Sequence, residues 1–70
     1  MTRTDLATLI KERRKQLNLS QVDLAELSEV SVRQLSDIET QKSSPTIETL
    51  SKICETLGLS MELGVKGRDV

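Results

Sequence analysis

The sequence predicts a small all-α domain: a compact bundle of four helices, with five as the alternative, followed by one short C-terminal strand. Three observations predict it. Apolar residues recur at helical spacing through most of the 70 residues. Ser or Thr, which cap helix N-termini well, precede these stretches. After Gly58 the apolar residues fall at every second position, which is typical of a strand.

The first expected helix begins after Thr2, which can cap it with Asp5 as its capping-box partner. Its second half is basic, which suits a helix C-terminus. Asn18 is suited to end it in a left-handed conformation. We expect the inner face of this helix to consist of Leu6, Leu9, Ile10, Arg13 or Arg14, and Leu17.

Residues 20–39 predict two short helices joined by a tight corner. Ser20 can form a capping box with Asp23 at the start of the first helix, and Ser31 with Gln34 at the start of the second. A small residue, Ala25, allows the two helices to cross closely. The positions expected to face the core are Leu24, Ala25, Val30, Leu35 and Ile38. This is the layout of a helix-turn-helix whose second helix is presented to a partner.

A further helix is expected after a polar loop, with Thr46 or Ser44 as its cap and Gly58 at its end. Its apolar face should consist of Ile47, Leu50, Ile53, Cys54 and Leu57. The predicted strand covers residues 59–66, and its apolar positions are Leu59, Met61, Leu63 and Val65. Because a lone strand leaves backbone groups unpaired, we expect it to pair with a second copy in a homodimer. Residues 67–70 are expected to form a tail.

Composition and charge exclude several classes of protein. With no His and one Cys, the chain lacks a ligand set for a transition metal, so we expect no cofactor. The sequence shows no nucleophilic side chain beside a general base, so we expect that the protein is not an enzyme. We find no signal peptide or transmembrane run, which predicts a cytoplasmic protein with no membrane partner. The net charge of −1 means that any nucleic-acid surface must be a local basic face.

The chain resembles the Cro/cI-type (XRE) repressor family. The resemblance rests on Leu19-Ser20-Gln21, Leu24-Ala25-Glu26, Val30-Ser31, Leu35-Ser36-Asp37-Ile38-Glu39, and the run from Ser44 to Leu50. It implies that residues 1–58 form a lambda-repressor-like domain of bacterial type, associated with the nucleoid. It also implies a homodimer that represses transcription from a palindromic operator in double-stranded DNA. Two positions depart from the family pattern: Glu29 replaces the usual corner Gly, and Ser28 replaces an apolar residue.

Residues 57–63 are similar to the C-terminal strand region of HipB-like antitoxins. This narrower resemblance implies the antitoxin of a toxin–antitoxin pair, with a HipA-type kinase toxin as its partner. One alternative is a solitary or restriction-modification-type XRE regulator without a toxin. Others are an interaction module that no longer binds DNA, and an acyl carrier. An acyl carrier needs Asp-Ser-Leu at a helix start, whereas the order here is Ser36-Asp37-Ile38.

The resemblance implies that Gln21 contacts the DNA backbone. In the second helix and the loop after it, the expected DNA-binding residues are Ser31, Val32, Arg33, Gln34, Ser36, Asp37, Lys42 and Ser43. Arg33 can bind guanine O6 and N7, and Val32 can pack on a thymine methyl group. Asp37 either accepts from a cytosine amino group or holds Arg33 in an i,i+4 ion pair, and we favour the ion pair.

The resemblance also implies a structural ion pair between Arg14 and Glu39. Arg13 is expected to be solvated or to contact a phosphate. Val22 and Leu27 are apolar on the outward side of their helix. They are either ordinary surface residues or part of a surface that meets a toxin.

Overall fold

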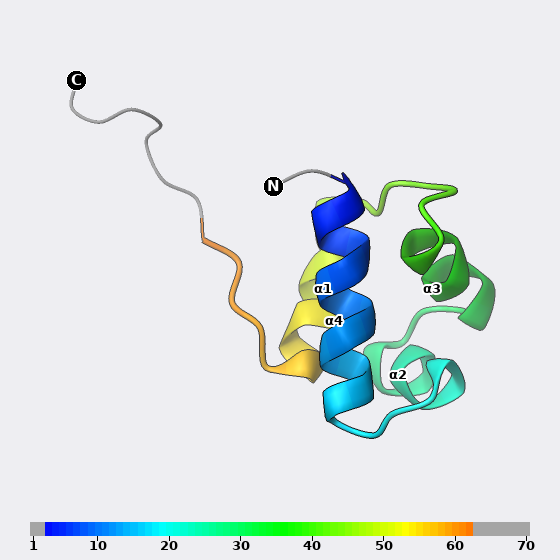
Figure 1. Ribbon diagram of the computed structural model, residues 1–70, viewed down its shortest axis with the longest axis vertical. Coiled ribbons are helices and arrows are strands. Elements are labelled where there is room, and N and C mark those ends of the chain that lie inside the picture. The colour runs from blue at the N-terminus through cyan, green and yellow to red at the C-terminus, as the bar shows by residue number, and fades with distance from the viewer. Residues whose placement is uncertain (1–2, 63–70) are drawn as a thin grey trace.

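The computed structural model describes residues 3–62. It contains α1 (Arg3–Gln16), α2 (Gln21–Ser28), α3 (Val32–Glu39) and α4 (Ile47–Leu57). α1 and α4 pack side by side, and α2 and α3 lie together beside them (Figure 1). α1 contacts α3 and α4, and α2 contacts the same two helices. Within residues 3–62, no helix is both long enough and apolar enough to cross a membrane.

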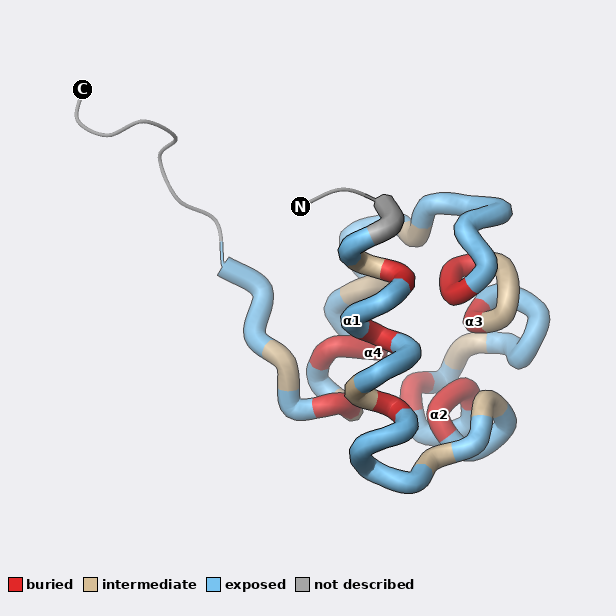
Figure 2. The backbone as a smooth tube through the Cα atoms, viewed as in Figure 1, coloured by how far each residue is buried: buried red, intermediate tan, exposed pale blue. Residues whose placement is uncertain are grey.

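The core is aliphatic and draws on all four helices. Buried positions on each helix face the centre of the bundle (Figure 2). Fully burying one such side chain stabilises a fold by about 1.5–3 kcal/mol. The buried cluster consists of Ile10, Leu24, Ala25, Leu35, Ile38, Ile53 and Leu57. A second shell of partly buried side chains packs on it: Leu6, Leu19, Val30, Leu50 and Leu59.

The predicted inner face of α1 is partly wrong. Leu9 and Leu17 are 38 % and 39 % exposed, whereas Ala7 is only 3 % exposed. The buried positions Ala7, Ile10 and Arg14 are spaced by three and four residues, so they form the stripe that faces the core. The small Ala7 lies on this stripe because it lets α1 approach its neighbours closely.

The predicted apolar face of α4 holds except at its first residue. Ile53, Cys54 and Leu57 are buried, but Ile47 is 70 % exposed. Helical spacing alone marks Ile47 as inward, yet it opens the helix beside an exposed loop and cap. Thr46, not Ser44, is the cap, because its hydroxyl accepts the backbone N–H of Thr49 at 3.1 Å. Burial raises the pKa of the Cys54 thiol, which agrees with its predicted place on the apolar face.

All four helices end in the same way. A residue just past each end is left-handed, and in three of the four places it is not glycine. These residues are Asn18, Glu29, Gln41 and Gly58. In each case two backbone N–H groups return to carbonyls of the last turn, which is the Schellman motif. The next residue is apolar and packs on the core at Leu19, Val30 and Leu59, but at the end of α3 it is the exposed Lys42.

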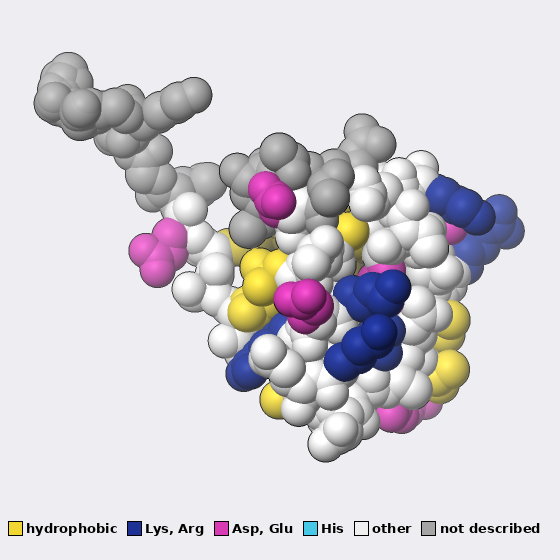
Figure 3. Space-filling model, viewed as in Figure 1, with side chains coloured by type: hydrophobic (Ala, Val, Ile, Leu, Met, Phe, Trp, Pro, Cys, Tyr) yellow, Lys and Arg dark blue, Asp and Glu magenta, His cyan; other side chains and the backbone are white. Residues whose placement is uncertain are grey.

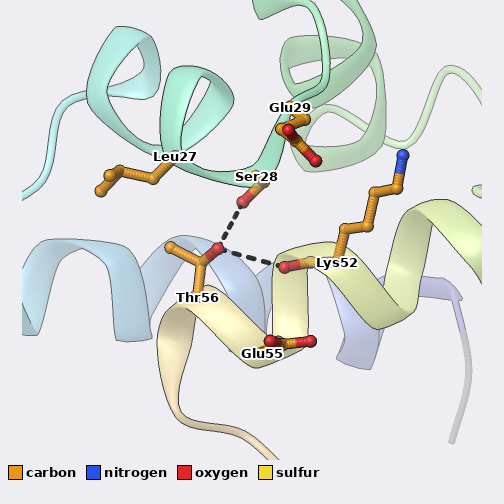
Figure 4. Close-up of a pocket in the computed structure, with 6 residues that line it drawn as sticks. All are labelled: Leu27, Ser28, Glu29, Lys52, Glu55 and Thr56. Carbon is orange, nitrogen blue, oxygen red and sulfur yellow. Dashed lines mark hydrogen bonds between the residues drawn. The ribbon is translucent and has the colours of Figure 1, made fainter.

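The corner between α2 and α3 is left-handed at Glu29, with φ 59° and ψ 39°. A non-glycine residue in this conformation costs about 1–2 kcal/mol, so the corner is strained. Ser28, the other departure from the family pattern, is buried. Its hydroxyl donates to Thr56 Oγ1 at 3.0 Å, and Thr56 donates to the Lys52 carbonyl at 3.1 Å (Figure 4). The polar side chain is therefore satisfied at a position where the family has an apolar one.

Beyond α4, Gly58 ends the helix as predicted, and Leu59 packs against the core. Residues 59–62, the described part of the predicted strand, form no strand. Met61 is exposed. The rest of that prediction, including Leu63 and Val65, lies outside the described residues, as does the predicted cap at Thr2.

Candidate nucleic-acid interface

α3 begins with the predicted capping box. The Ser31 hydroxyl accepts the backbone N–H of Gln34 at 3.0 Å, and Gln34 Oε1 accepts the backbone N–H of Ser31 at 3.0 Å. Both side chains are expected to bind DNA, and both are engaged at the helix start. The amide nitrogen of Gln34 makes no hydrogen bond within residues 3–62, so it can still donate outward.

α3 buries one face and presents the other. Leu35, Ile38 and Glu39 are buried. On the other face Val32 is 41 % exposed and Arg33 is exposed, while Ser36 and Asp37 are half-buried. This face therefore offers a methyl-bearing side chain, a guanidinium, a hydroxyl and a carboxylate along a single helix.

The favoured ion pair between Arg33 and Asp37 is absent from the described structure. Both side chains lack a protein partner within residues 3–62. Exposed i,i+4 pairs contribute only a few tenths of a kcal/mol, so solvent competes effectively for both groups. The guanidinium and the carboxylate are thus both available to a ligand.

The C-terminal end of α3 is fixed by a buried ion pair. Arg14 Nε donates to Glu39 Oε2 at 2.8 Å, and Arg14 Nη2 donates to Glu39 Oε1 at 3.0 Å. Arg14 Nη1 also donates to the Leu19 carbonyl at 2.8 Å. This confirms the structural pair and extends it, because one guanidinium joins the end of α3 to the turn that precedes α2.

The hydrogen bond from Arg14 to Glu39 raises the pKa of Arg14 above its ordinary value. A raised pKa on a cation gives stability that is fully present below the ordinary arginine pKa. That stability is lost only as pH rises through the still higher pKa of the folded state. The charge of Arg14 therefore supports the fold throughout the physiological pH range.

Gln21 belongs to the same network. Its Nε2 donates to Glu39 Oε1 at 3.1 Å, so its side chain lies against α3 and is half-buried. The sequence indicated a DNA-backbone contact for Gln21 but not this link. The Glu39 carboxylate thus links the last turn of α3 to the first turn of α2.

The loop after α3 is tied back to that helix. Thr40 donates its hydroxyl to the Ser36 carbonyl at 2.8 Å. The backbone N–H groups of Lys42 and Ser43 donate to the Asp37 carbonyl at 2.8 Å and 3.3 Å. Both side chains are exposed, so the structure places an ammonium and a hydroxyl beside the outward face of α3.

Figure 3 shows Lys and Arg side chains at the edge of the view where α3 and the loop after it lie, and others over α1. Arg13 does not belong with α3. Its Nε donates to the Leu57 carbonyl at 2.9 Å, which places a cation at the C-terminus of α4. The expectation that Arg13 is solvated is therefore wrong, whereas a phosphate contact by this residue stays a prediction.

Leu27 and Val22 are 61 % and 57 % exposed on α2. Leu27 is one of the residues that line a hollow between α2 and α4, together with Glu29, Lys52 and Glu55 (Figure 4). The hydrogen-bonded pair of Ser28 and Thr56 also lines it.

Comparison with known proteins shows a family and a relative that the chain resembles. A family model described as helix-turn-helix matches residues 10–63. The chain is also similar to the ImmF control region 10 kDa protein of Bacillus phage phi105, with 36 % identity over 58 residues. The aligned segment covers 83 % of this chain and 64 % of the phage protein, so the chain spans just under two thirds of that relative.

Proposed function

Because the chain belongs to the helix-turn-helix family of Cro/cI-type DNA-binding transcriptional regulators, we propose that it is a sequence-specific repressor. In this proposal a homodimer binds a palindromic operator with α3 in the major groove. The observation that carries it is the outward face of α3, where Arg33 is exposed without a protein partner in the described residues. A guanidinium in this position can donate two hydrogen bonds to guanine O6 and N7.

Phosphate contacts would position this helix. Lys42 and Ser43 are exposed. Their backbone N–H groups are hydrogen-bonded to the Asp37 carbonyl, which fixes them relative to α3. Gln21 can serve as well, because a primary amide carries two N–H groups and only one is needed for Glu39. In this proposal Lys42, Ser43 and Gln21 hold the DNA backbone, and Val32, Arg33, Ser36 and Asp37 meet the bases.

The experiment that tests the function is selection of binding sites from a random DNA pool. The expected product is a palindrome whose half-sites lie about one helical turn apart, roughly 34–36 Å. Arg33→Ala is the matched control, because it removes the proposed guanine contact from an exposed residue. If the native protein enriches no sequence, or enriches the same sequences as Arg33→Ala, α3 is not the reading helix.

Dimerisation is the second part of the proposal, and the alternating apolar residues of 59–66 support it. Because Leu59 packs on the core, a truncation after Glu62 spares the fold and removes the rest of the predicted strand. We expect sedimentation to show a dimer for the full chain and a monomer for the truncated one. A stable truncated dimer would mean that the helices hold the protomers together.

The antitoxin role and its HipA-type kinase partner stay predictions from the narrower resemblance. The alternative is a regulator without a toxin, and the name of the phage relative, a control region protein, supports a regulatory role in either case. Purification from the host under native conditions separates the two. A stoichiometric kinase in the purified complex, absent when Val22 and Leu27 are replaced by Ser, supports the antitoxin. A repressor dimer alone supports the solitary regulator.

A further inference from the structure

We propose that Asp37 determines sequence specificity by accepting a hydrogen bond from the exocyclic amino group of a cytosine. This cytosine lies one or two base pairs from the guanine bound by Arg33. The inference rests on the proposed function, because it assigns a base to the helix that would read DNA. Of the two roles that the sequence left open for Asp37, it takes the contact with cytosine in place of the favoured ion pair with Arg33, which is absent from the described residues.

With α3 in the major groove, the spacing of Arg33 and Asp37 would put the two side chains over neighbouring base pairs. Arg33 and Asp37 are four residues apart, so they lie on the same face of α3 and about 6 Å apart along its axis. Stacked bases on one strand are about 3.4 Å apart. Two side chains with this spacing therefore reach base pairs that are one or two steps apart.

The carboxylate of Asp37 is available while its backbone is fixed. The Asp37 carbonyl accepts the N–H groups of Lys42 and Ser43, which ties the phosphate-facing loop to this residue. Its side chain makes neither a hydrogen bond nor an ion pair within residues 3–62. It is also half-buried, so its position is restricted by neighbours although its charge has no partner among those residues. Because the Asp37 carboxylate can only accept hydrogen bonds and its position is restricted, it favours a base that presents a hydrogen-bond donor to α3.

The negative charge of Asp37 makes the affinity for DNA depend on which base the carboxylate meets. Next to phosphates it is unfavourable on every DNA sequence, because like charges repel. Only a base that offers a donor can offset that repulsion. In the major groove cytosine offers N4 and adenine offers N6, whereas guanine and thymine offer only acceptors. A carboxylate accepting from cytosine N4 is the usual pairing, whereas adenine is usually bound by an amide that also donates to N7.

The test is site selection from a random pool with the native protein and with Asp37→Asn, which keeps the shape and removes the charge. The native protein should select two G·C pairs one or two steps apart in each half-site. Asp37→Asn should change the preference at the cytosine position alone, towards adenine, and should leave the guanine position unchanged. Discrimination at that position should fall by about 5- to 150-fold.

Two further variants complete the design. Asp37→Glu keeps the carboxylate and should keep the preference for cytosine. Glu55→Gln removes the same charge from an exposed residue of α4, so it controls for net charge. Binding to a random duplex should tighten with Asp37→Asn, because the repulsion is gone, and should change much less with Glu55→Gln.

Three results would overturn the proposal. If Asp37→Asn tightens operator and random duplexes equally and selects the same sites, Asp37 only repels phosphates. If the native protein selects adenine at the position that Asp37→Asn alters, the cytosine assignment is wrong. If the native protein selects no sequence at all, the proposed function itself fails. That failure is distinguishable, because a failure confined to Asp37 leaves the guanine position selected.

Discussion

The two ends of α3 are held in different ways. The N-terminal end follows the strained corner at Glu29 and is closed by a local, exposed capping box between Ser31 and Gln34. The C-terminal end is closed by Glu39, which binds Arg14 and Gln21 from two other helices. The N-terminal end of α3, where the proposed base-contacting face begins, is thus held by residues close to it in the sequence. The orientation of the helix depends instead on a buried contact between distant parts of the chain.

The largest effect on stability should come from breaking the buried ion pair at the C-terminal end of α3. Arg14→Ala leaves the Glu39 carboxylate, whose side chain is only 2 % exposed, without its cation. We expect a decrease of about 3–5 kcal/mol in the free energy of unfolding, the range for removing one partner of a buried pair. Denaturant melts measure it.

Glu39→Gln is the matched variant, because it keeps an acceptor for Gln21 while removing the negative charge. It should be destabilised as well, since Arg14 then has no counter-charge. If the unfolding midpoints of Arg14→Ala and Glu39→Gln both equal that of the native protein, the network does not hold α3.

A smaller effect on stability is expected at the N-terminal end of α3, which the capping box closes. Ser31→Ala removes the hydroxyl that accepts the N–H of Gln34. Loss of such a cap costs about 1 kcal/mol. Ser20→Ala makes the same change at the capping box of α2 and is the control. Both should melt similarly, but operator binding should weaken more with Ser31→Ala. Equal weakening would show that the start of α3 has no special part in binding.

The smallest effect has the opposite sign. Glu29→Gly should stabilise the protein by about 0.5–1 kcal/mol, because glycine relieves the left-handed strain while adding flexibility to the unfolded chain. Gly58→Ala is the reciprocal change at a helix end with φ 71°, and it should destabilise by a similar amount. The new Cβ would meet Arg13 Nη2 at 3.6 Å, an ordinary van der Waals distance, so only the backbone is tested. Thermal melts that move both variants in the same direction would contradict this account.

The same contrast explains what could be predicted from the sequence. The capping boxes at Ser20 and Ser31, the left-handed Asn18 and the helix end at Gly58 depend on residues a few positions apart. Their signals are therefore complete within a short stretch of chain. The pair of Arg14 and Glu39 is also predictable, but from the family resemblance rather than from spacing.

The features that sequence reasoning missed depend on tertiary packing. Helical spacing could not show that Ala7 is buried while Leu9 is exposed, because that depends on where neighbouring helices lie. Nor could it show that Gln21 turns towards Glu39, or that Arg13 binds the end of α4. The predicted pair of Arg33 and Asp37 is wrong because spacing permits an ion pair but does not require one.

The most direct test of the central claim, that α3 reads bases while the loop after it holds phosphates, is binding of Arg33→Ala and Lys42→Ala to operator and random duplexes across a salt series. Arg33→Ala should weaken binding by about 1–3 kcal/mol per half-site on the operator and much less on random DNA. Lys42→Ala should weaken both duplexes by similar factors and flatten the salt slope by about one unit for each phosphate that is no longer neutralised. If Arg33→Ala instead weakens both duplexes equally, Arg33 only binds phosphate and the account of α3 as a base-reading helix is contradicted.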